Sequence, residues 1–148
     1  MKRLIVLIVV AASVFIFVGC TNTGTDALDD AGNGIRIDVD IGERFFVNQM
    51  FEIFLNYRQY LGNTIRYEGM FHTIQWGGDE FHVVFRYMLG CCGEEEILGF
   101  EVMLNDTDPF PDDTWVEVIG ELDQDDGFLI VRVISITEMD QRGEAFVS

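Results

Sequence analysis

Residues 64–88 read TIRYEGMFHTIQWGGDEFHVVFRYM, and this alternation of apolar and polar side chains is typical of strands with one buried face. Two glycines and an aspartate at 77–79 interrupt the alternation where a hairpin turn is expected. We therefore predict two antiparallel strands over residues 64–76 and 80–88. The side chains expected to face the core are Ile65, Tyr67, Gly69 and Phe71 in the first strand and Phe81, Val83, Phe85 and Tyr87 in the second.

Three further strands are expected downstream of this hairpin, over residues 97–104, 115–122 and 128–137. Asp125-Asp126-Gly127 is a hairpin signal that joins the last two strands. The connection over residues 105–114 contains both prolines of the chain and reads as a loop. Five short strands in a domain of this size favour a small OB-like barrel, and a fragment of a β-sandwich is the alternative.

Upstream of residue 64 the spacing changes to that of a helix. Apolar residues recur at intervals of three and four over residues 44–61, with Asn48 as the expected N-cap and Gly62 as the stop. The fold class is therefore mainly β with one N-terminal amphipathic helix. We expect one domain, residues 44–140, followed by a tail over residues 141–148, because the chain is too short for two cores.

The N-terminus reads as a secretion signal. Lys2 and Arg3 precede an apolar run over residues 4–18, which ends in Gly19-Cys20 and resembles a lipobox. We expect residues 1–19 to be a lipoprotein signal peptide and Cys20 to carry the lipid, including palmitate. Residues 20–43 then form a flexible acidic tether. These features predict an extracytoplasmic protein anchored to the bacterial cell membrane, with membrane lipid as its first partner.

The charge of the chain limits its ligands. The formal net charge is −17, and removal of Lys2 and Arg3 with the signal peptide would leave about −19 and no lysine. A polyphosphate would approach against this field, so we expect no nucleic-acid partner, while cations and basic partners are favoured.

Several short motifs carry a resemblance to a known family: Tyr60 to Ile65, Glu68-Gly69, Phe85-Arg86-Tyr87, Gly90-Cys91-Cys92, Gly99, Asp113 to Val118 and Gly120. Over roughly residues 48–138 the chain is similar to the C-terminal OB-like domain of the permease-associated membrane proteins of Firmicutes. The resemblance implies an integral membrane permease as partner and a role in metal homeostasis, particularly of zinc. In that family an aspartate follows the cysteine pair, and Glu95 stands at its position here.

The cysteine pair is the first candidate site, and three interpretations stay open. Cys91 and Cys92 could bind zinc with Glu95 as a further ligand, because thiolates favour zinc or copper(I) over calcium or magnesium. In an oxidising compartment they could instead form a strained, redox-active disulfide. They could also be small apolar residues at the end of a strand.

The two histidines are a second candidate metal pair. The expected pairing of the first two strands places His72 opposite His82 or one diagonal away, on the face away from the core. The chain contains no nucleophile elbow, P-loop, dinucleotide fingerprint or HExxH motif, so we expect no enzyme. The expected function is a binding or interaction module that assists a permease or zinc homeostasis. The alternative is a small thiol redox protein that uses Cys91 and Cys92.

Overall fold

The computed structural model describes residues 28–29 and 34–148. The elements, in chain order, are β1 (Leu28–Asp29), β2 (Arg36–Ile37), β3 (Val39–Ile41), α2 (Phe46–Asn56), β4 (Thr64–Trp76), β5 (Asp79–Leu89), β6 (Glu95–Met103), β7 (Thr114–Asp125), β8 (Phe128–Glu138) and β9 (Phe146–Val147). Single 3₁₀ turns, Glu43–Phe45 and Tyr57–Gln59, extend α2 at its two ends. Thus the mainly β class is confirmed.

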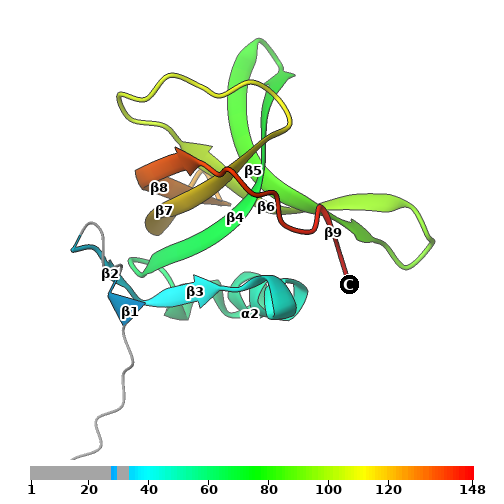
Figure 1. The fold of residues 1–148 in the computed structure, drawn as a ribbon, viewed down its shortest axis with the longest axis horizontal. Helices are drawn as coiled ribbons and strands as arrows, with labels where there is room; N and C mark the ends of the chain where they lie inside the picture. The colour runs from blue at the N-terminus through cyan, green and yellow to red at the C-terminus, as the bar shows by residue number, and fades with distance from the viewer. Residues whose placement is uncertain (1–27, 30–33) are drawn as a thin grey trace, which may run out of the picture.

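The five long strands form a closed ring (Figure 1). Their order is β4-β7-β8-β6-β5, and a further pairing of β5 with β4 closes the circle. All contacts are antiparallel except that of β6 with β8, which is parallel. Short strands β3 and β9 lie at the outer edges of β4 and β5. This ring of five strands agrees with the small, mainly β domain predicted from the sequence.

The strand bounds follow the alternation closely. The prediction of residues 64–76 coincides with β4, and the other four long strands differ from their predicted ends by a few residues. The close approach of a neighbouring strand also explains why residue 99 is a glycine. A Cβ at Gly99 would collide with the backbone of Val84 and Phe85 on the neighbouring strand, so only glycine fits there.

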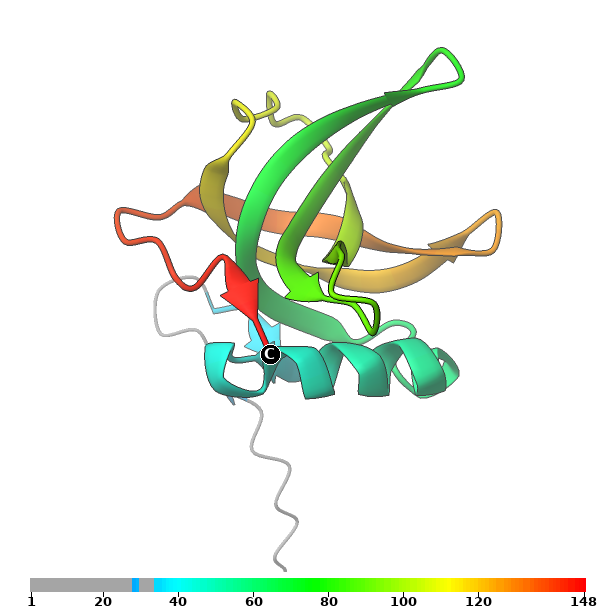
Figure 2. The same cartoon turned by 90° about the vertical axis from the view of Figure 1, so that its right-hand side faces the viewer.

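Helix α2 lies below one end of the ring (Figure 2). Its buried residues, Phe46, Met50 and Ile53, join the main core together with side chains from all five ring strands. The predicted N-cap was wrong, because Asn48 lies inside the first helical turn and Phe45 precedes the helix. The helix also isn't the first element, since strands β2 and β3 come before it.

The described strands extend beyond the predicted domain limits, residues 44 and 140, at both ends. Ile37 and Ile41 are buried at 1% and 3% exposure, and β3 pairs with β4. Apolar side chains in a short acidic segment were sufficient to dock it on the edge of the ring. Residues 146–147 pair with β5, so the end of the chain belongs to the domain as well.

The wrong face of β5 was predicted to point toward the main core. The turn between β4 and β5 contains two residues, Gly77 and Gly78, both with positive φ, so Trp76 pairs with Asp79. A three-residue turn was assumed, and a shift of one residue exchanges the two faces of a strand. Val84 consequently lies in the main core, whereas Phe85 packs with Met70 and Trp115 in a second, outer cluster.

Within residues 28–29 and 34–148, no helix is long and apolar enough to cross a membrane.

Candidate functional site

The cysteine pair lies at the tip of the hairpin between β5 and β6. The Gly93 N–H donates to the Gly90 carbonyl at 2.9 Å, and the Gly90 N–H donates to the Glu94 carbonyl at 2.8 Å. Gly93 takes a φ of +78°, which suits the left-handed residue of a three-residue hairpin loop. Cys91 and Cys92 therefore occupy the two central positions of the turn. We call residues 90–94 the thiol hairpin.

Both thiols of this hairpin are free and exposed, and their Sγ atoms lie 3.7 Å apart. Two thiolates that share a tetrahedral zinc ion at about 2.3 Å are separated by about 3.8 Å, the edge of the tetrahedron. The spacing therefore suits a shared soft metal ion. A disulfide would require the two sulfur atoms to approach to about 2.05 Å.

The remaining zinc ligands are not supplied by the described part of the chain. Among residues 28–29 and 34–148, no three His, Cys, Asp or Glu side chains gather closely enough to hold a metal ion. Glu95, the predicted third ligand, pairs with Leu89 at the base of the hairpin. Neighbouring Glu96 instead places its carboxylate against the backbone of Gly90. The thiol hairpin offers two ligands and no complete zinc site.

The two histidines do not form a pair. In the observed register His72 is opposite Val83 and His82 is opposite Thr73, so the two rings project from opposite faces of the strands. His72 bonds through Nε2 to the Asp113 carboxylate at 2.9 Å, on the outer face. His82 stacks on Phe71 with ring centroids 5.5 Å apart, on the face of the main core. The prediction that they oppose one another was wrong, and the shifted register is the reason.

A cavity beside His82 carries one perturbed carboxyl group. Glu80, His82, Glu101 and Asp125 contribute polar side chains to its lining, and its volume is about 420 Å³. Burial raises the pKa of Glu101, and the negative charge of Asp125 raises it further, while His82 acts in the opposite direction. The cavity thus brings the carboxyl groups of Glu80, Glu101 and Asp125 together around one histidine.

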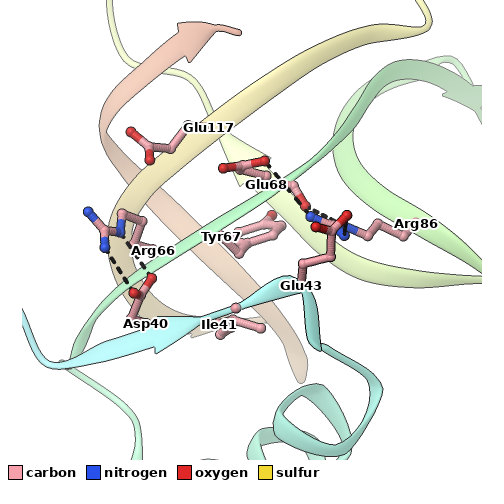
Figure 3. Close-up of a pocket in the computed structure, with 9 residues that line it drawn as sticks. Asp40, Ile41, Glu43, Arg66, Tyr67, Glu68, Arg86 and Glu117 are labelled. Carbon is pink, nitrogen blue, oxygen red and sulfur yellow. Dashed lines mark hydrogen bonds and ion pairs between the residues drawn. The ribbon is translucent and has the colours of Figure 1, made fainter. Parts of the chain in front are cut away.

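The most extensive charged network surrounds Arg86, which lies on β5 and is 1% exposed (Figure 3). Its guanidinium lies between two aromatic rings, 4.6 Å from the Phe46 centroid and 4.8 Å from that of Trp115. The Arg86 Nε donates to the Glu68 carbonyl at 2.8 Å. The carboxylate of Glu43 lies 3.5 Å from its Nη1. Burial lowers the pKa of Arg86, and the Glu43 and Glu68 carboxylates act against this shift.

This network borders a cavity of about 310 Å³ at the junction of β3, β4 and β7, lined by Asp40, Ile41, Gly42, Glu43, Arg66, Tyr67, Glu68, Arg86 and Glu117. The Arg66 guanidinium binds the Asp40 carboxylate through two bonds of 3.0 and 2.9 Å. The Trp115 Nε1 donates to Glu68 at 3.2 Å. Because these charges satisfy one another, we interpret the network as support for β3 and α2 rather than as a ligand site.

Sequence reasoning missed Arg86 as a structural centre. The alternation of the strand, with a three-residue turn assumed before it, assigned Arg86 to the face away from the core together with Glu80 and His82. The aromatic residues that enclose it come from distant parts of the chain, at positions 46 and 115. Only the tertiary structure brings them together.

A comparison with protein families places these features in context. The sequence model described as the DUF1980 C-terminal domain matches residues 23–147, which includes the ring, α2 and the thiol hairpin. The chain belongs to this family. No curated protein matches the chain. The DUF1980 match begins before β2 and ends in β9, so it includes all of the strands from β2 onward. Cys20, the predicted site of lipid attachment, lies outside both the match and the described residues.

Proposed function

We propose that this DUF1980 domain is a non-catalytic binding module, anchored outside the cytoplasmic membrane through acylated Cys20, that contacts a membrane permease through its thiol hairpin. The observation that carries the proposal is the pair of exposed thiols, 3.7 Å apart, at the tip of a hairpin. Exposure leaves both sulfur atoms accessible to another molecule. Their spacing suits one shared zinc ion.

The partner completes the site in this proposal. Structural zinc takes four ligands, and the hairpin supplies two thiolates. The other two ligands would come from the permease, so that zinc is held between the two proteins. The three successive carboxylates of Glu94, Glu95 and Glu96 would attract a divalent cation toward the thiols.

Metal analysis and partner capture test this function together. Full-length protein with Cys20 intact is isolated from membranes without chelator, and its zinc content and captured partners are measured. The double variant Cys91→Ser/Cys92→Ser should lose both the zinc and the permease. Ile134→Ser, which replaces an apolar residue 52% exposed on β8, is the matched control and should retain both. Zinc and partner retained by the double variant would refute the proposal.

A thiol redox protein is the second candidate, because the two sulfurs are adjacent and accessible. Closing the disulfide would transfer two electrons to an external disulfide and release two protons. Adjacent Cα atoms lie about 3.8 Å apart across a trans peptide, below the usual range of 4.4–6.8 Å in disulfides, so the closed form would be strained. Thiol titration before and after reduction distinguishes the two functions: thiols that appear only after reduction, in protein without zinc, favour the redox role.

A further inference from the structure

Helix α2 is apolar on its outer side as well as on its core side. Phe51 and Leu55 are 43% and 78% exposed, and Phe54 is also exposed. Val47, which is half-buried, is followed by Phe51 and Leu55 at intervals of four residues, and Phe54 follows Phe51 by three, so the four side chains form one continuous stripe along the helix. We call Val47, Phe51, Phe54 and Leu55 the apolar stripe. Exposed patches of this kind mark interaction or membrane surfaces.

The apolar surface continues beyond the helix. Val47 also lines a groove of about 410 Å³, whose other walls are formed by Met88, Leu89, Phe146, Val147 and Ser148. Leu89 and Phe146 are 66% and 51% exposed. The stripe and the groove therefore give the domain one extended apolar surface, next to the strand that leads into the thiol hairpin.

The charge around the stripe differs from that of the rest of the protein. Arg44 and Arg58, both exposed, lie in the turns that extend α2 at its two ends. Exposed Glu52 on α2 and Glu43 in the preceding turn are the acidic residues of this stretch, so residues 43–59 balance two acidic with two basic side chains, whereas the whole chain has 26 acidic residues against 9 basic ones. An apolar stripe between two arginines is the pattern of a helix that lies in the interface of an anionic membrane.

The chain enters the domain on the side of α2. The first strands, β2 and β3, lie beside the helix at one end of the molecule, and the turn between β4 and β5 lies at the other end (Figure 1). Gln49 on α2 bonds to both the Asp40 carbonyl and the Gly42 N–H, at 2.8 and 3.1 Å. If Cys20 is in the membrane, the segment from residue 21 to residue 33 can reach at most about 45 Å. Such a short connection keeps the α2 side at high effective concentration near the lipid surface.

We infer that α2 docks on the lipid bilayer through the apolar stripe. Phe51 and Leu55 would lie below the headgroups, and Arg44 and Arg58 would contact lipid phosphates. Docking would hold the thiol hairpin at a fixed height near the membrane, where a permease could reach it. The inference rests on the proposed lipid anchor and adds a second, non-covalent contact.

Fluorescence quenching by brominated lipids tests the orientation in acylated protein reconstituted into anionic vesicles. One variant carries Leu55→Trp with Trp76→Phe, and the control retains native Trp76, which is 76% exposed at the far end of the molecule. Buried Trp115 gives the same background in both. We expect Trp fluorescence from position 55 to be quenched several-fold more than that from position 76. Equal quenching at both positions, or none at either, would overturn the inference.

Vesicle binding by protein that lacks the acyl group on Cys20 distinguishes docking through α2 from anchoring through the lipid. The mature chain with Cys20→Ser should cosediment with anionic vesicles, and the added pair Phe51→Ser/Leu55→Ser should weaken this binding about tenfold or more. Phe128→Ser, which replaces an apolar residue 72% exposed at the start of β8, should leave it unchanged. Failure of palmitate to label Cys20 would refute the anchor alone. A Cys20→Ser chain that forms dimers through the stripe and ignores vesicles would refute docking.

Discussion

Removal of the Arg86 side chain should destabilise the domain more than any surface change. Arg86→Ala leaves the Glu68 carbonyl without its 2.8 Å donor, at a cost of about 1–3 kcal/mol. It also removes the guanidinium from between Phe46 and Trp115, where two cation–π contacts contribute about 1–2 kcal/mol together. Glu43 and Glu68 are 53% and 36% exposed, so water can solvate them after the change. We expect a total loss of about 4 kcal/mol.

Two further variants distinguish how much the length and how much the charge of the Arg86 side chain contribute to stability. Arg86→Met keeps an apolar chain between the rings and should cost about 2 kcal/mol, because it removes the hydrogen bond but fills the space. Arg86→Lys keeps the charge without the planar group that bonds and stacks, and should fall between the other two.

Urea unfolding followed by Trp115 fluorescence, in a Trp76→Phe background, measures these differences. Trp115 contacts the substituted side chain directly, so its emission reports the site itself. The wild-type domain should have a stability of about 5–15 kcal/mol, against which a loss of 4 kcal/mol is readily resolved. A loss below about 1 kcal/mol for Arg86→Ala, or equal losses for the alanine and methionine variants, would refute this account of the site.

Three other predictions concern the ring and the thiol hairpin. Gly99→Ala should cost several kcal/mol or prevent folding, because its Cβ would collide with the backbone of Val84 and Phe85; circular dichroism and urea unfolding would measure this. Glu101→Gln should raise stability slightly at neutral pH. Since the folded-state pKa of Glu101 is raised, the wild type loses stability as the pH rises through that pKa, and the advantage of the variant should disappear in acid, which unfolding from pH 3 to pH 7 would follow. Cys92→Ser should change the unfolding free energy by less than about 0.5 kcal/mol, because the thiol is exposed; a larger loss would assign it a structural role.

The ring could be predicted because its strands alternate between apolar and polar side chains over much of their length. Alternate residues of β4 from Ile65 to Phe71 are buried, so the period of two indicated the bounds and the orientation of the strand, while Met70 on the opposite face is buried in the outer cluster. In β5 both faces are apolar, since Val84 enters the main core while Phe85 is covered by Met70 and Trp115. Alternation cannot say which of two apolar faces is the inner one. The inner face of β5 is set by the length of the glycine turn, because a turn of two residues and a turn of three place opposite faces of the strand toward the core.

The candidate site was predictable only as a list of reactive residues. The cysteine pair falls between two predicted strands, and in the structure it occupies the tip of the hairpin that joins them. Whether Glu95 could join the thiols depended on the pairing of β5 with β6, which places Glu95 opposite Leu89. Of the apolar stripe of α2, only Phe54 was among the residues whose helical spacing was assigned to the core, and Val47, Phe51 and Leu55 fall outside that set.

Residues 139–147 cross several distant elements at once. The Met139 N–H bonds to the Trp115 carbonyl, the Glu144 N–H to the Glu43 carboxylate, and the Tyr87 N–H to the Ala145 carbonyl. This segment therefore has no place to dock until α2, β5 and β7 have assembled. It should be the last part of the domain to fold and the first to detach, so its amide hydrogens should exchange with solvent well before those of the ring.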